Sequence, residues 1–298
     1  WFSDAIDRDL AGRHPYREWL SENHTKLTPF EDLSAAQAGI RDLSDDQLKK
    51  VQKYFGLTRE EIHDVVEVLG RDGKEAVGSM GDDTPLAGFS KTSPSIFDSF
   101  RQRFAQVTNP PIDPLREAFV MSLTTYIGAE QNVFCETSGH AERVQFKSPV
   151  LLYSDLRQLL DKKVHKTLSL AYPKDGDLKE AIIELCDDAE NAVKDGAVLV
   201  LLSDRHIHAD QLMIPAPLAV GAVQERLVDR HLRASANLFI ETGSVRDPHH
   251  FAVLLGLGAT AVYPYLAFES LAALVDAGML DDSLKSVLIK YRNGINGG

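Results

Sequence analysis

Two groups of histidines in this chain lie near a carboxylate, and either group could do chemistry. His249 and His250 are adjacent and follow Glu241 in the chain. His206 and His208 form an H-x-H pair in the stretch SDRHIHADQ, directly after an apolar run. Imidazole and carboxylate groups bind zinc and exchange protons near neutral pH. Whether they do so here depends on the elements that position them.

The spacing of the His249–His250 pair is unfavourable for a shared ligand. The pair follows the sequence RDP, in which Asp247 can cap a helix and Pro248 can occupy its first turn. Adjacent residues on a helix point about 100° apart, so the two imidazoles cannot both face one ion. We therefore expect framework residues: one imidazole packs toward the sheet, with Glu241 as its candidate hydrogen-bond partner, and the other meets a neighbouring helix.

The H-x-H pair carries the alternative hypothesis, a stand-alone metal-dependent (β/α) barrel enzyme. An open catalytic zinc site usually has three protein ligands. His206 and His208 supply two of them, and Glu241 is the one obvious donor at another strand end. Otherwise, this stretch is a polar loop at the mouth of the sheet, in which Asp204 and Arg205 form local ion pairs.

Nucleophile and dinucleotide chemistry have no comparable candidates. Cys186 lies inside an amphipathic helical pattern and is expected to be buried and inert, while Cys135 lies in a polar loop without a clear base. No G-x-S-x-G motif occurs, and no G-x-G-x-x-G follows a predicted strand. Two cysteines cannot by themselves hold a structural zinc or an iron–sulfur cluster, and they favour a reducing, cytoplasmic setting.

Charge and hydropathy exclude further classes of function. The chain has 298 residues and a formal net charge of −12, which argues against nucleic acid as a partner. No apolar run approaches the roughly 20 residues that span a bilayer, so no membrane partner is predicted. No signal peptide is recognisable, and the chain begins at Trp1 rather than Met, so we expect a fragment of a longer protein.

The first part of the chain, residues 1–73, has the sequence pattern of short helices joined by connectors. Capping-box spacings at Ser44 and Thr58 begin two of the helices. Gly70 and Gly73 are expected to end the second one. We therefore predict a helical linker or interdomain segment over residues 1–73.

Residues 74–298 are predicted to form an α/β domain, because strand and helix patterns alternate in its second half. Apolar strands are expected at 165–173, 197–205, 236–243 and 259–265, and helices at 178–196, 216–232, 248–258 and 267–278. Continuous apolar strands are typical of a parallel sheet covered by helices. We predict an incomplete or degenerate (β/α) TIM-barrel-like domain with parallel strands, in preference to an open doubly wound sheet. Chemistry in such folds lies at the carboxyl ends of the strands.

Six stretches of the chain resemble the central domain of the glutamate synthase large subunit. They are RHPYREWLSEN, EAVGSMGDDTPLA, FAQVTNPPIDPLREAFVMSL, SPVLLYSDL, GAVLVLLSDR and ETGSVRDPHHFAVLLGLGATAVYPYLAFESL. The resemblance runs in order from about Arg13 to the C-terminus. In that family an N-terminal glutaminase frees ammonia from glutamine. A flavin barrel with FMN and an iron–sulfur cluster then uses the ammonia and 2-oxoglutarate to form glutamate.

The resemblance implies that this chain is a non-catalytic part of an oxidoreductase and is inactive alone. The central domain of the family holds no cofactor, links the glutaminase and FMN domains, and lines part of the ammonia tunnel. The electron donor of the parent enzyme is left open between NADPH, NADH and ferredoxin, and with NADPH a small NADPH-oxidising subunit is a further partner. No catalytic, cofactor-binding or metal-binding residue is therefore expected in this chain.

The best functional candidates are then two loops rich in glycine and proline, GSMGDDTPLAGFS and VTNPP. A conduit for neutral ammonia needs rigid walls and a polar but uncharged lining. Residues of this kind in the two loops are Ser79, Gly81, Thr84, Thr108 and Asn109. They are the candidate tunnel residues.

Overall fold

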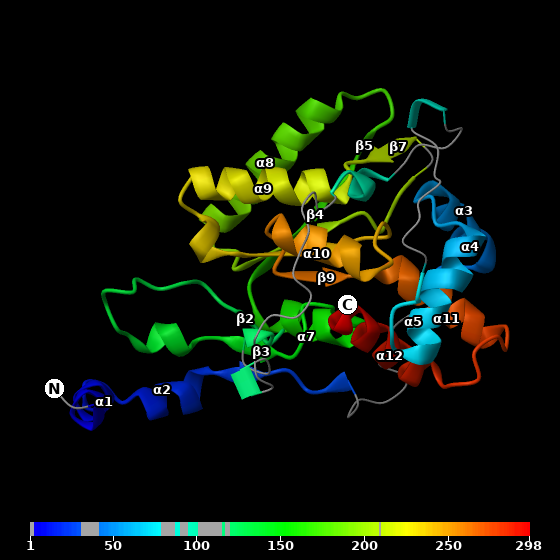
Figure 1. Cartoon of the computed structure of the whole chain (residues 1–298). Helices are drawn as coiled ribbons and strands as arrows, with labels where there is room; N and C mark the ends of the chain where they lie inside the picture. The colour runs from blue at the N-terminus through cyan, green and yellow to red at the C-terminus, as the bar shows by residue number, and fades with distance from the viewer. Residues whose placement is uncertain are drawn as a thin grey trace.

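The computed structural model describes most of the chain (Figure 1). The described residues are 3–30, 42–78, 87–89, 95–100, 115–116, 120–208 and 210–298. The five candidate tunnel residues, Ser79, Gly81, Thr84, Thr108 and Asn109, lie outside the described residues. Their assignment stays a prediction.

A parallel sheet of four strands, in the order β4–β6–β8–β9, forms the centre of the molecule (Figure 1). The strands are β4 (His165–Ser169), β6 (Leu199–Ser203), β8 (Asn237–Glu241) and β9 (Ala261–Tyr263). Every residue of β6, β8 and β9 is buried, because both faces of the sheet are covered. The predicted α/β class with parallel strands is confirmed.

The helices of this half lie close to their predicted positions. They are α8 (Leu178–Lys194), α9 (Ala216–Asp229), α10 (Pro248–Gly256) and α11 (Tyr265–Asp276); a further helix, α12 (Leu284–Gly297), was not predicted. Helices α8, α9 and α10 connect successive strands of the sheet, and α9 contacts both of the others. As predicted, the Asp247 side chain caps α10, accepting from the backbone N–H of His250 at 3.0 Å. No helix among the described residues is long and apolar enough to cross a membrane.

One predicted strand, 165–173, is two strands in the structure. After β4 the chain turns into β5 (Ala171–Pro173), which pairs antiparallel with β7 (Gln211–Met213). The division falls at Leu170, which is fully buried. Its N–H donates to Ser203 O of β6, while its carbonyl accepts from Ile214 N beyond β7. An apolar run cannot show that its backbone changes partners partway along.

Helices from the N-terminal segment pack against the C-terminal helices. They are α3 (Asp45–Tyr54), α4 (Arg59–Glu61), the π-helical turn η3 (Ile62–Val66) and α5 (Glu67–Asp72). Helix α3 contacts α11, and α5 contacts α11 and α12. The capping boxes at Ser44 and Thr58 are confirmed. The division of the chain at residue 73 stays a prediction.

Gly70 does not end a helix as predicted; it lies inside α5 at a close approach of helices. A Cβ placed on Gly70 would lie 2.6 Å from Leu271 Cδ2 of α11 and 3.0 Å from Val287 Cγ1 of α12. Gly73 is the residue that ends α5, with a φ of +66° that favours glycine. Gly70 therefore serves packing rather than helix termination.

The rest of the described chain includes a smaller sheet, three more α-helices and the short 3-10 helices η4 (Ala87–Phe89), η5 (Ile96–Ser99), η6 (Ser138–Ala141) and η7 (Arg233–Ser235). The sheet has the order β1–β3–β2, from β1 (Thr25–Lys26), β2 (Thr125–Ile127) and β3 (Val144–Phe146). The helices are α1 (Ser3–Gly12), α2 (Tyr16–Asn23) and α7 (Tyr153–Lys162). Between β3 and α7, Val150 makes a parallel bridge to Val262 of β9, so this part of the chain adjoins the edge of the central sheet.

Candidate functional site

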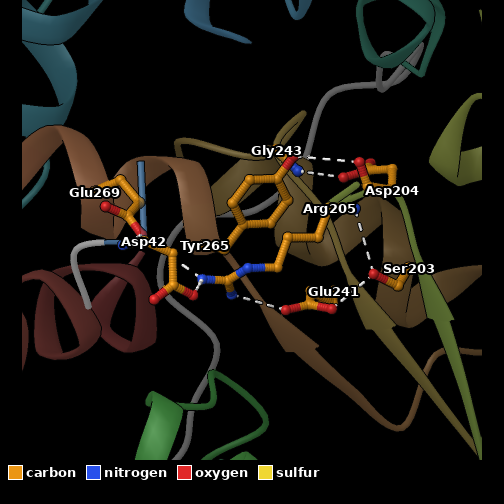
Figure 2. Close-up of polar contacts among 8 residues, drawn as sticks. All are labelled: Asp42, Ser203, Asp204, Arg205, Glu241, Gly243, Tyr265 and Glu269. Carbon is orange, nitrogen blue, oxygen red and sulfur yellow. Dashed lines mark hydrogen bonds and ion pairs between the residues drawn. The ribbon is translucent and has the colours of Figure 1, made fainter. Parts of the chain in front are cut away.

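A buried polar cluster lies at the carboxyl ends of β6, β8 and β9 (Figure 2). Ser203 and Glu241 are the last residues of β6 and β8, and the other members follow the strands or come from distant segments. We call it the Arg205 cluster; its members are Asp42, Ser203, Asp204, Arg205, Glu241, Gly243, Tyr265 and Glu269. In a (β/α) fold this edge of the sheet is where substrates and cofactors bind.

The Arg205 guanidinium lies at the centre of the cluster and contacts three carboxylates. It donates to Glu241 Oε1 at 2.9 Å and to Asp42 Oδ2 at 2.6 Å, and it lies 3.6 Å from Glu269 Oε1. Ser203 Oγ donates to the other oxygen of Glu241 at 2.6 Å. The side chain of Arg205 is 9% exposed. The predicted local ion pair is therefore wrong: the acidic partners of Arg205 come from β8, from α11 and from the segment that precedes α3.

Two tyrosine rings enclose the same guanidinium. The Arg205 Cζ lies 5.9 Å from the ring centroid of Tyr263 and 5.2 Å from that of Tyr265, within cation–π range. Burial raises the pKa of both phenols above their ordinary value, so both remain neutral. Burial opposes the charge of Arg205, but Tyr263 and Glu241 outweigh it, and the pKa of Arg205 lies above its ordinary value. The cation is permanent.

Asp204 is also buried but accepts hydrogen bonds from neutral donors. Its Oδ1 accepts from Gly243 N at 2.9 Å, and its Oδ2 accepts from Thr242 Oγ1 at 2.5 Å. Burial raises the pKa of Asp204 to about 7, although the donors Thr242 and Gly243 favour the ionised form. Tyr265 OH donates to the backbone carbonyl of the same residue at 3.3 Å. The carboxyl group thus closes the turn that follows β8.

Sequence reasoning missed two members of the cluster. Glu269 lies on α11 and is 4% exposed, so an acid within the apolar run YLAFESLAALV was the signal for a buried ionic partner. Asp42 lies in a polar connector, and no feature of the sequence distinguishes it. Its backbone N–H donates to Glu269 Oε1 at 3.1 Å.

The adjacent histidines pack away from the cluster. His249 Nε2 lies 3.1 Å from the carbonyl oxygen of Phe97, and the ring of His250 packs against that of Phe97 at a tilt of 46°, with centroids 4.4 Å apart. Burial lowers the pKa of His250 to about 4, so it is neutral. The expected hydrogen bond to Glu241 is wrong, because that carboxylate is engaged by Ser203 and Arg205.

The structure does not support the metal-dependent alternative. His206 and His208 are exposed and line a groove beside the cluster, whereas Glu241 is turned to Arg205. In the part of the chain that is described, no group of three or more His, Cys, Asp or Glu side chains could hold a metal ion. Cys186 is buried, which raises the pKa of its thiol, and Cys135 is exposed.

The composition of the Arg205 cluster limits what it can do. The Arg205 guanidinium faces the carboxylates of Asp42, Glu241 and Glu269, so its charge is engaged by groups of the protein itself. The Ser203 hydroxyl and the Gly243 N–H are likewise used by protein acceptors. Among the described residues, the arrangement joins segments that lie far apart in the chain.

Comparison with known proteins identifies the family. The sequence model of the glutamate synthase central domain matches residues 50–298, and the chain belongs to this family. A chloroplastic ferredoxin-dependent glutamate synthase of Oryza sativa subsp. japonica is 39% identical over 273 residues, which cover 89% of this chain and 17% of the relative. The NADPH-type glutamate synthase large chain of Bacillus subtilis is 34% identical over 298 residues, covering 99% of this chain and 19% of the relative.

The chain therefore spans less than a fifth of the length of these relatives. Among solved structures, a flavocytochrome b2 variant with sulfite bound aligns with 50% of this chain and 35% of its own. Its TM-score is 0.32 and its sequence identity is 19%. A TM-score this low does not establish a shared fold.

Proposed function

We propose that this chain is a non-catalytic coupling module of a glutamate synthase large subunit. It links the glutaminase and FMN domains of the same subunit and lines part of the ammonia tunnel. The observation that carries this proposal is the Arg205 cluster. It fills the edge of the sheet where a (β/α) enzyme would bind its ligand, with an ion-pair network that is internal to the protein.

The same cluster supports the proposal that this chain holds no cofactor. Phosphate-bearing cofactors bind to free backbone N–H groups and basic side chains at strand ends. Here Gly243 N donates to Asp204, Arg205 N donates to Ser203 Oγ at 3.3 Å, and the guanidinium is neutralised by acids. FMN and the iron–sulfur cluster then belong to the neighbouring domain of the full subunit.

The winding of the sheet supports an incomplete barrel rather than a doubly wound sheet. The strand order β4–β6–β8–β9 follows the chain order without reversal. Because crossovers between parallel strands are right-handed, an order without reversal places α8, α9 and α10 on one face. A doubly wound sheet reverses direction and has helices on both faces. Val150 precedes β4 in the chain yet bridges to β9 at the opposite edge, as a barrel's first strand would.

The reaction of the parent enzyme follows from the family. The curated relatives are glutamate synthases that depend on ferredoxin or NADPH by name. We propose that this chain acts within an enzyme that forms glutamate from glutamine and 2-oxoglutarate in the cytoplasm. With NADPH as donor, a small NADPH-oxidising subunit is an additional partner. Nucleic acid and membrane are not partners.

Two measurements test the proposal. The purified chain is expected to show no flavin absorbance and to form no glutamate from ammonia, 2-oxoglutarate and a reductant. Stoichiometric bound flavin, or glutamate formation by this chain alone, would overturn it. In the second measurement, the chain replaces the matching segment of the Bacillus subtilis large chain. This chimera is expected to form glutamate with glutamine as nitrogen source, whereas a large chain lacking the segment is not.

A further inference from the structure

A groove with apolar walls lies beside the Arg205 cluster, between α3 and the loop that follows β6. Its volume is about 600 Å³, within the range of small-molecule sites. Lining residues also come from β7 and from Lys174, which follows β5. This groove has no part in the coupling role proposed above.

The two long walls of the groove are apolar and come from different segments. Val51 and Tyr54 lie one helical turn apart on α3, so they face the same way. Ile207 of the loop and Leu212 of β7 also line the groove. The hydroxyl of Tyr54 accepts a hydrogen bond from Met213 N at 2.9 Å, which attaches α3 to β7. The walls are therefore fixed to the fold.

The charged side chains that line the groove are basic. Lys50, Lys174 and Arg205 line it together with His206 and His208, and the described lining residues include no Asp or Glu. Arg205 and Lys50 are paired with acids that lie outside the lining, so Lys174 supplies the positive charge at the rim. A lysine at the rim of an apolar groove favours a ligand with an anionic head group.

Three of these basic side chains are available to a ligand. Arg205 is engaged by carboxylates, and Lys50 pairs with Asp46 at 2.5 Å. For the side chains of Lys174, His206 and His208, the described part of the chain provides no hydrogen bond or ion pair. They lie at the exposed rim, where a ligand head group can reach them.

We propose that this groove binds an organic anion that has a carboxylate or phosphate head and an aromatic or aliphatic body. The body packs between Val51 and Tyr54 on one side and Ile207 on the other. The head lies at the rim against Lys174 and the two imidazoles. The apolar walls account for the apolar body of this ligand, and the basic rim accounts for its anionic head.

Three naphthalene compounds of similar size test the proposal on the full 298-residue chain. They are 1-naphthylacetate, 1-naphthyl phosphate and the neutral 2-(1-naphthyl)ethanol, with binding measured by calorimetry and by chemical-shift mapping. At least one anion is expected to bind about tenfold more tightly than the alcohol, since one charge interaction near a protein surface is worth about 1–2 kcal/mol. Comparison of the two anions shows which head group the site prefers.

Matched variants locate the site. Lys174→Glu is expected to weaken binding of the preferred anion by about tenfold or more and to leave the alcohol nearly unchanged. Ile207→Ser is expected to weaken anion and alcohol alike, because it removes apolar contact. Lys166→Glu is the control, since Lys166 is exposed on β4 and does not line the groove. Each variant is checked for unchanged circular dichroism.

Three outcomes would overturn the proposal. The first is no saturable binding of any of the three compounds. The second is equal affinity for the anions and the alcohol. The third is an effect of Lys174→Glu no larger than that of Lys166→Glu. Because Lys174 lies in an exposed turn, its substitution is not expected to unfold the chain.

Discussion

Arg205 donates a 2.6 Å hydrogen bond to Asp42, although the two residues are 163 positions apart in the chain. The backbone N–H of Asp42 donates in turn to Glu269 of α11. The guanidinium also binds Glu241 at the end of β8. One side chain thus attaches the segment that leads into α3 to the central sheet and to a C-terminal helix. This relationship makes Arg205 the most sensitive position of the cluster.

Arg205→Met is expected to lower the free energy of unfolding by about 3–5 kcal/mol, because it removes the counter-ion of buried Glu241. Urea unfolding at pH 7 measures this. Asp42→Asn is the matched control: the Asp42 side chain is 62% exposed, so its loss should cost about 1 kcal/mol or less. A similar cost for both variants would contradict the central role of the buried cation.

The buried carboxyl group of Asp204 makes stability depend on pH. Its folded pKa of about 7 lies above the ordinary value of 3.8 for an exposed aspartate, so the folded state holds the proton more tightly. The resulting stabilisation is complete below about pH 4 and is lost as the pH rises through 7, on the order of 4 kcal/mol in total.

Asp204→Asn removes this titration, and Thr242 Oγ1 can accept from the new amide. The variant is expected to gain stability relative to the wild type as the pH rises from 4 to 7.5, as measured by urea unfolding at each pH. Asp188→Asn, on the exposed face of α8, is the control: its free energy of unfolding should change with pH in parallel with that of the wild type. A parallel profile for Asp204→Asn would show that Asp204 is ionised throughout this range.

The buried imidazole of His250 makes the folded protein less stable as the pH falls, which is the opposite of the effect of Asp204. Its folded pKa of about 4 lies below the ordinary value of 6.5, so the unfolded state takes up the proton first. Stability is therefore lost as the pH falls from 6.5 to 4, on the order of 3 kcal/mol. His250→Phe keeps a planar ring against Phe97 and should remove this loss. His208→Gln, at an exposed position, should leave it in place.

Gly70→Ala tests the close approach of α5 to α11 and α12. Alanine favours a helix interior by up to about 1 kcal/mol over glycine, but here its Cβ would meet fully buried Leu271 and Val287. A net loss of about 1–3 kcal/mol is expected from thermal or urea unfolding. Gly256→Ala in α10 meets nothing within 4 Å and should be neutral or stabilising. A stabilising Gly70→Ala would mean that the helices have room to move.

Much of the local structure could be predicted from residue patterns. The capping boxes at Ser44 and Thr58, the cap at Asp247 and the buried strands all appear where short-range rules place them. These features depend on neighbours within one or two helical turns or on continuous apolar runs, so they can be recognised in the sequence itself. The family was recognisable from motifs for a similar reason, since they are continuous in the chain.

The partners of charged groups could not be predicted in this way. Arg205 was expected to pair locally, and its acids come instead from Asp42, Glu241 and Glu269. Leu170 marks a change of strand partner inside a stretch that was predicted as one strand. Gly70 has the sequence signature of a helix end but faces two other helices. These contacts join residues that are far apart in the chain, and the folding of the backbone brings them together.

Residue order was thus sufficient for the helix caps at Ser44, Thr58 and Asp247, for strands β6, β8 and β9 and for the family, because each of these depends on local hydrogen bonding or on contiguous motifs. The filled edge of the sheet and the basic groove beside it depend on where separate segments meet. Packing between α3, α11 and the strand ends sets those positions, and no local pattern encodes it.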